Sequence, residues 1–161
     1  MKRVLGIAMA VAVAVAAVAG CGIWLVVRHH HKQLPEISAY SDGHLVRVGP
    51  YRYCEVLNLN NCQDPQSQGE LEVTAKQPVQ LSVPTAIGRV PWRLLQVYED
   101  PRDTAVTYFA PGTRLAVTVP TVDPHRGRLT GIAVQLLTLV LDETGEVADV
   151  PHAEWSVRTV W

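Results

Sequence analysis

Hydrophobic and polar side chains alternate along most of the chain after residue 33, and this alternation constrains the fold more than any other feature. Successive side chains of a half-buried β-strand point to opposite faces of a sheet, so a two-residue repeat is typical of strands. The clearest alternating runs are Leu71–Ala75, Val79–Val83, Thr113–Val119 and Glu154–Thr159. Turn-forming glycines and prolines separate the runs; they include Asp42-Gly43, Gly49-Pro50, Pro111-Gly112, Pro120, Pro124, Gly145 and Pro151. The pattern predicts short strands joined by turns.

The longest apolar run after residue 33 is Leu129–Leu141, whose length is also compatible with a helix. Its many β-branched residues favour a long central strand, and Asp142–Gly145 reads as the turn that follows. Trp92–Tyr98, which follows Pro91, is a second candidate for a central strand.

About eight to ten short strands in one domain predict an all-β fold, a two-sheet immunoglobulin-like sandwich. Cys54 and Cys62 are too close in sequence to join distant strands, as the disulfide of an antibody domain does. We therefore expect the likeness to be architectural, with Trp92 filling the core without a sulfur partner.

The N-terminal run Val4–Val27 holds 24 residues without a charge. As a helix it would be about 36 Å long, enough to cross a hydrocarbon core of about 30 Å. Arg28 and Lys32 end the run. We therefore expect residues 1–32 to be a signal-anchor or transmembrane segment with basic flanks, followed by an extracytoplasmic domain at residues 33–161.

A second interpretation of this segment is a lipoprotein signal. Val18-Ala19-Gly20-Cys21 matches a lipobox, which makes Cys21 the candidate lipidation site. The apolar residues Ile23–Val27 favour the uncleaved anchor, because a lipoprotein usually continues with a polar tether. Both interpretations place the domain outside the cytoplasmic membrane, with the lipid bilayer as a partner. The basic residues on both flanks do not by themselves fix the orientation.

Cys54 and Cys62 are the only cysteines beyond the N-terminal segment, and seven residues separate them. In an oxidising compartment such a pair usually forms a disulfide. A zinc site would need two more ligands at short spacing, and a redox pair normally reads Cys-x-x-Cys. The pair therefore predicts a structural disulfide.

Charge argues against a nucleic-acid partner. Four of the 14 basic residues flank the N-terminal segment, which leaves 10 basic against 15 acidic residues in the domain. Nucleic-acid binding requires clustered Lys and Arg, and no basic stripe is present.

Candidate sites for catalysis or metal binding are weak in this sequence. Asp123 and His125 pair a carboxylate with an imidazole, but their neighbours indicate a turn. The acidic group Glu99, Asp100 and Asp103 lacks the ligand spacing of a calcium loop. The adjacent histidines His29–His31 indicate a cluster facing lipid headgroups rather than a metal site. We expect no catalytic residue, metal or cofactor.

The aromatic residues give the candidate interaction surface. Tyr51 and Tyr53 share one face of a candidate strand, and Trp161 is the last residue of the sequence. Tyrosine and tryptophan dominate binding hot spots, although they are also ordinary core residues.

Six segments together resemble an uncharacterised family of actinobacterial, mycobacterial-type membrane-anchored proteins, a domain of unknown function. They are Ser38–Gly43, Val48–Cys54, Pro91–Tyr98, Pro111–Leu115, Val134–Leu137 and Trp155–Thr159. The resemblance covers most of the domain and implies a cell-envelope protein. It implies no activity and no functional residues.

By exclusion, the sequence favours a non-enzymatic binding or assembly module of the bacterial cell envelope. Its expected partner is another envelope protein or a cell-wall component. One alternative is a carrier of a lipid or other apolar ligand, held in a cavity between the sheets. A second alternative is a hydrolase using Asp123 and His125.

Overall fold

The computed structural model describes residues 15–22, 24, 34–141 and 145–161. The chain divides into two units, Met1–Gln33 and Leu34–Trp161. In the first unit, residues 15–22 and 24 are helical, and Cys21 is exposed and unbonded. No helix within the described ranges has the length and apolar character needed to span a bilayer. Most of the predicted span Val4–Val27, and all of His29–His31, lie outside the described residues.

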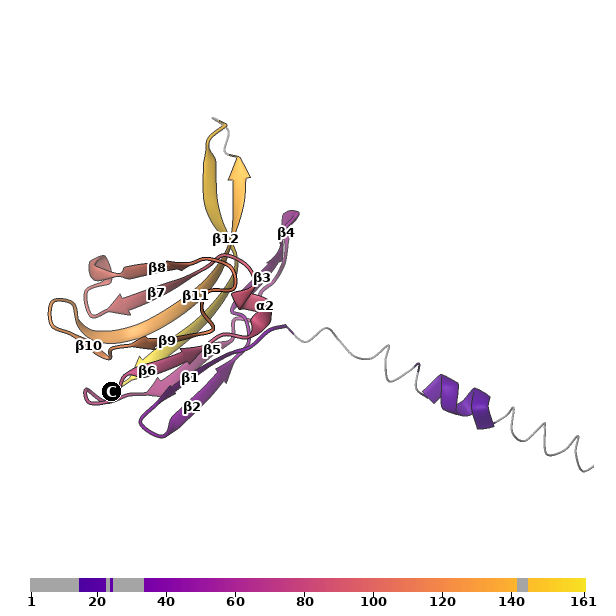
Figure 1. The fold of residues 1–161 in the computed structure, drawn as a ribbon, viewed down its shortest axis with the longest axis horizontal. Coiled ribbons are helices and arrows are strands. Elements are labelled where there is room, and N and C mark those ends of the chain that lie inside the picture. The colour runs from indigo at the N-terminus through magenta and orange to yellow at the C-terminus, as the bar shows by residue number, and fades with distance from the viewer. Residues whose placement is uncertain (1–14, 23, 25–33, 142–144) are drawn as a thin grey trace, which may run out of the picture. The chain divides into compact units, whose positions relative to one another are not determined.

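The domain of the second unit is all-β, and two sheets form a sandwich (Figure 1). The smaller sheet is antiparallel, in the order β2-β1-β6-β9. Its strands are β1 (Ile37–Ser41), β2 (His44–Val48), β6 (Val79–Ser82) and β9 (Ala116–Val119).

The larger sheet has the order β4-β3-β12-β11-β7-β8. In addition, β5 pairs with β12 in parallel and β10 pairs with β11. Its strands are β3 (Arg52–Glu55), β4 (Asn58–Gln63), β5 (Gln68–Glu72), β7 (Trp92–Tyr98), β8 (Ala105–Phe109), β10 (Val122–Asp123), β11 (Gly127–Leu141) and β12 (Val147–Val160). Two short helical turns, α2 (Thr85–Gly88) and η1 (Pro101–Asp103), lie before and after β7.

One contiguous hydrophobic core fills the space between the sheets. Trp92 lies in it with 1% of its surface exposed, as predicted, and Trp155 is fully buried beside Tyr53. The Trp155 indole donates from Nε1 to the carbonyl oxygen of Pro35 at 2.7 Å, which ties the start of the domain to β12. A buried indole N–H usually needs such an acceptor.

The two central-strand predictions are confirmed, whereas the predicted runs Leu71–Ala75 and Thr113–Val119 are strand only at residues 71–72 and 116–119, because turns and loops occupy the rest. Leu129–Leu141 lies entirely within β11, and Trp92–Tyr98 is β7. The described part contains twelve strands rather than eight to ten, because β4 and β10 carry no long alternation. Pro151 does not separate two strands as predicted. β12 runs through it, and the pairing with β11 shifts register between Leu136 and Leu137. Proline is tolerated at such bulges because they interrupt the hydrogen-bond ladder.

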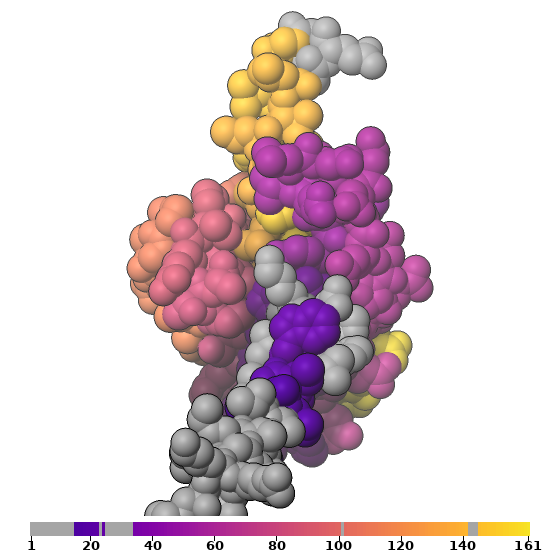
Figure 2. Space-filling model, turned by 90° about the vertical axis from the view of Figure 1, so that its right-hand side faces the viewer, coloured from indigo at the N-terminus to yellow at the C-terminus, as the bar shows by residue number. Residues whose placement is uncertain are grey.

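The end of the paired strands β11 and β12 projects from the sandwich (Figures 1 and 2). We call residues 137–141 of β11 and 147–151 of β12 the arm. On the β7 side, pairing with β11 ends at Leu136, and β3 pairs with β12 only at Ala153 and Glu154. The two strands of the arm therefore pair only with each other among the residues described.

Candidate functional site

An apolar groove of about 560 Å³ lies where the arm leaves the sandwich. Three separate chain segments form it: the start of β7, the end of β8 and the arm. The lining residues are Pro91, Trp92, Tyr108, Phe109, Ala110, Pro111, Leu137, Thr138, Leu139 and Asp149. Its volume is within the usual range for ligand-binding clefts, about 300–1,000 Å³.

Two stacked aromatic rings form the inner wall of this groove. Trp92 and Phe109 are directly opposite in the β7–β8 pairing, with ring centroids 4.1 Å apart and planes 18° apart. The Trp92 Nε1 is buried and has no hydrogen-bond partner among the described residues. The inner wall is therefore apolar, and it contains one buried donor that is unsatisfied among the described residues.

One face of the arm extends this apolar surface outward. Leu139 pairs with Asp149, and Leu141 pairs with Val147, so these four side chains share a face of the ribbon. Leu139, Leu141 and Val147 are 69%, 68% and 63% exposed. Because Leu139 and Asp149 also line the groove, the groove and the arm face form one continuous surface.

The neighbouring strand β8 is the last strand of its sheet and pairs only with β7 in the described structure. Its residues carry no charge, and Val106 and Tyr108 are 46% and 60% exposed. Arg93 Nη1 donates to the Tyr108 hydroxyl at 3.5 Å, which brings a basic group to the edge of the groove. An uncharged sheet edge of this kind offers its backbone to an added strand.

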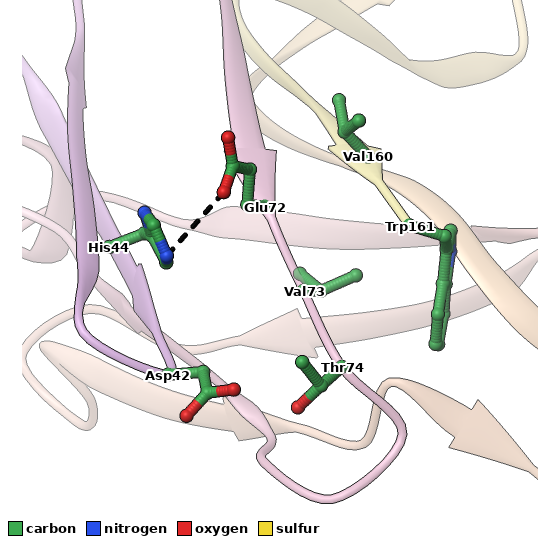
Figure 3. A pocket seen from close by; sticks show the side chains of 7 residues that line it. All are labelled: Asp42, His44, Glu72, Val73, Thr74, Val160 and Trp161. Atoms are coloured by element: carbon green, nitrogen blue, oxygen red, sulfur yellow. Dashed lines mark ion pairs between the residues drawn. The ribbon is translucent and has the colours of Figure 1, made fainter.

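A second, smaller cavity of about 270 Å³ lies at the end of β12 (Figure 3). Asp42, His44 and Glu72 lie on one side of it, and Trp161 on the other. His44 Nε2 is 3.5 Å from a Glu72 carboxylate oxygen, and both side chains are mostly exposed. No three metal-binding side chains gather closely enough to hold an ion within the described ranges.

The predicted aromatic surface is divided between two places. Tyr51 is 39% exposed, and its N–H donates to the Glu154 carbonyl in the middle of β12. Tyr53 is half-buried and packs edge-on against Trp155 and His152. Trp161, at the far end of β12, donates from Nε1 to the Leu129 carbonyl at 3.0 Å. The three residues therefore do not form one patch.

The candidate catalytic and calcium-binding carboxylates serve local turns. Asp123 accepts hydrogen bonds from the backbone N–H groups of His125 and Arg126, and these bonds hold its pKa below the usual value. Asp100 pairs with the Arg102 side chain, and this contact lowers the pKa of the Asp100 carboxyl. Asp123 and Asp100 thus each form an Asx turn, whereas Glu99 accepts a hydrogen bond from the Arg128 backbone N–H at 3.4 Å.

The predicted disulfide is present. Cys54 of β3 faces Cys62 of β4, and their sulfurs are bonded. The bond closes the β3–β4 hairpin next to His152, whose Nδ1 lies 3.3 Å from the Cys54 carbonyl oxygen.

Sequence alone missed the groove, because its walls come from residues 91–92, 108–111, 137–139 and 149. The only sequence feature that pointed to the groove was the apolar end of the Leu129–Leu141 run, whose side chains the structure leaves exposed. A buried central strand does not need apolar residues on both faces at its end.

These features define a class of protein: a disulfide-bonded β-sandwich domain with a projecting two-stranded arm beside an aromatic groove. The family described as "Protein of unknown function (DUF2771)" matches residues 30–160, and the chain belongs to this family. Uncharacterized proteins of Mycobacterium bovis and Mycobacterium tuberculosis are each 68% identical over 143 residues, covering 89% of this chain and 88% of the relative. No solved structure matches the chain. The resemblance to an uncharacterised actinobacterial family is thereby confirmed.

Proposed function

We propose that this protein is a non-enzymatic binding or assembly module of the bacterial cell envelope. In this proposal, residues 1–32 anchor an immunoglobulin-like domain on the outer side of the cytoplasmic membrane. The single observation that carries the binding function is the apolar surface formed by the groove and the arm face.

The arm is the strongest support, because a two-stranded ribbon alone in water is only marginally stable. Its three exposed aliphatic side chains gain little from the sandwich, yet they lie on one face and continue into the groove. Contiguous exposed apolar surface usually marks an interaction site. Aromatic residues such as Trp92, Tyr108 and Phe109 are also enriched at the energetic centre of interfaces.

The proposed location rests on the sequence and on the disulfide. The uncharged run Val4–Val27 has the length of a membrane span, and the lipobox ending at Cys21 is the alternative anchor. The Cys54–Cys62 bond fits an oxidising compartment outside the cytoplasm. The mass of the mature N-terminus distinguishes the two anchors, because lipidation would remove residues 1–20 and add a lipid to Cys21.

A carrier of apolar ligands would need room for the ligand to leave water. The space between the sheets is occupied by the hydrophobic core, including Trp92 and Trp155. The groove is open, so a ligand there would keep much of its surface exposed, whereas carriers bury most of it. We therefore propose a protein partner for the groove.

Photo-crosslinking in the native cell tests this function. The full chain would carry benzoylphenylalanine in place of Tyr108 in the groove or, as the control, in place of Tyr40, which is 40% exposed on β1. We expect one reproducible protein, identified by mass spectrometry, to be trapped at Tyr108 and not at Tyr40. Lipid or glycan adducts at Tyr108, without a protein, would instead identify a carrier or wall binder. Equal trapping at both positions would refute the proposed surface.

A further inference from the structure

We infer that the groove and arm receive an extended, cationic segment of another envelope protein. The segment would add as a β-strand beside residues 137–141 of β11, with a Lys or Arg side chain that reaches across Leu139 to Asp149 of β12. This inference rests on the proposed function and specifies the chemistry of the partner.

The first step in the argument is the vacant position beside β11. β7 pairs with β11 from Tyr98 to Trp92, which lies opposite Leu136. Pro91 precedes Trp92 and has no N–H to extend the ladder. Among the described residues, the edge of β11 from Leu137 to Leu141 therefore has no strand beside it on this side. A partner strand placed there would continue the line of β7 and convert the ribbon into a three-stranded sheet.

The second step is the side-chain pattern that such a strand must carry. Alternate side chains of an added strand would lie on the arm face with Leu139, Leu141 and Val147. By the same alternation this face also carries Tyr108, whereas Trp92 and Phe109 line the groove from the opposite face, level with Leu136. The partner therefore needs apolar residues at alternate positions, one of which is an anchor that fills the groove.

The third step is charge. Asp149 lies on the same face as Leu139, lines the groove and is exposed, and it forms no ion pair with another described residue. Between Arg128 and Arg158 the sequence contains five Asp and Glu residues and no Lys or Arg. A cationic side chain near Asp149 would therefore meet no positive charge from residues 129–157, and Arg93 of β7 is already bonded to Gln135.

The same charge argues against other occupants of the arm. A second copy of the chain would bring an equally acidic arm, and like charges across an interface are unfavourable. The anionic headgroups of a bilayer surface would also be repelled, since they attract basic rather than acidic segments. A cationic protein segment satisfies both the apolar face and the carboxylate.

The test is a charge swap in the native cell with the full chain. Benzoylphenylalanine at position Leu139 would trap the partner, and mass spectrometry would identify the crosslinked peptide. That peptide should carry a Lys or Arg with apolar residues at alternate positions. Asp149→Lys should lower the crosslinking yield about tenfold. The control Asp103→Lys makes the same charge change in η1, at the far end of β7, and should leave the yield unchanged.

Restoration of the yield by a second change would complete the evidence. Replacing the identified basic residue of the partner by Glu should restore crosslinking to the Asp149→Lys chain. If a protein is trapped with the same yield by the wild-type and Asp149→Lys chains, the cationic-strand inference is overturned and the proposed function stands. Crosslinks only between copies of this chain would also overturn the inference. Lipid adducts alone would overturn both.

Discussion

Gln135 is a polar residue in the middle of the long strand β11, yet only 7% of its surface is exposed. Its amide joins two neighbouring strands: Arg93 Nε donates to Gln135 Oε1 at 2.7 Å, and Gln135 Nε2 donates to Glu154 Oε2 at 2.6 Å. The register places the three residues side by side on the face away from the core. Gln135 thus accepts a hydrogen bond from the Arg93 guanidinium and donates one to the Glu154 carboxylate, and its replacement would remove both bonds.

Replacing Gln135 by alanine should destabilise the domain by roughly 1–3 kcal/mol, because hydrogen bonds to charged groups contribute about that much and the half-buried Arg93 and Glu154 regain only part of it from water. Gln80→Ala is the matched control, because Gln80 is an exposed glutamine on β6. We expect this control to change stability by less than about 0.5 kcal/mol. Urea unfolding followed by tryptophan fluorescence measures both. Equal effects of the two substitutions would show that the Arg93–Gln135–Glu154 row does not stabilise the sheet.

Asp123 gives the domain a predictable response to acid. The backbone N–H of His125, together with that of Arg126, lowers the carboxyl pKa below its usual value of 3.8. A lowered pKa in the folded state means that the contribution of Asp123 to stability is fully present above pH 3.8. The contribution is lost as the pH falls through the folded-state pKa.

Asp123→Asn keeps an oxygen acceptor for the turn but removes the titration. We expect the variant to melt at a lower temperature than the wild type at pH 7, with the difference shrinking as the pH falls below about 3.8. Melting temperatures from pH 7 to pH 2.5 measure this, with Asp103→Asn as a control in a neighbouring turn. A difference that stayed constant across the range would mean that the charge of Asp123 does not contribute.

At the scale of elements, the sequence predicted the strands that bury one face. β7 and β11 carry β-branched and apolar residues in the expected places, and their core side chains, such as Leu94 and Val134, are fully buried. β12 was predicted only in part, since Pro151 indicated a break. The strand continues because Pro151, which has no N–H, lies at the bulge opposite Leu136 and Leu137, where the hydrogen-bond ladder is interrupted. A local pattern cannot reveal a bulge that depends on the partner strand.

The β3–β4 hairpin shows how a covalent bond replaces a missing apolar pattern. β4 has no buried residue, and its sequence Asn58–Gln63 lacks alternation. The bond between Cys54 and Cys62 holds it against β3, and Cys54 is 3% exposed. The cysteine spacing, rather than hydrophobicity, was the sequence signal for this element.

Reduction of this disulfide should lower the free energy of unfolding by about 2.5 kcal/mol, the loop-closure value for a short loop. Urea unfolding of the wild type with and without dithiothreitol measures the difference. The double variant Cys54→Ala with Cys62→Ala should show no response to the reductant. A reduced wild type as stable as the oxidised form would indicate that β3 and β4 hold together without the bond.

At the scale of the whole molecule, the candidate site was beyond the reach of sequence patterns. The two sheets follow from alternation and turns, but the groove depends on where β7 starts, where β8 ends and how far β11 and β12 continue together. Each of these limits is set by tertiary pairing. Asp149 reads in the sequence as an ordinary acidic residue near a turn, and only its place opposite Leu139 gives it a role.

The arm also separates binding from stability. No described residue from 137 to 152 belongs to the hydrophobic core; the core members nearest the arm are Leu136 and Ala153. Replacing residues 139–149 by Asn-Gly would leave Thr138 paired with Val150 across a two-residue turn of the type favoured in hairpins. We expect this shortened chain to unfold within about 1 kcal/mol of the wild type, since it loses exposed rather than buried apolar surface.

The same shortened chain should no longer trap a protein from benzoylphenylalanine at Tyr108, although that position itself is unchanged. Urea unfolding and crosslinking in the native cell, done on the same variant, measure the two properties. Loss of crosslinking with stability retained would mean that the arm exists for contact with a partner. If instead the shortened domain were strongly destabilised, the arm would be part of what holds the sandwich together. Its exposed leucines would then need a structural explanation rather than a functional one.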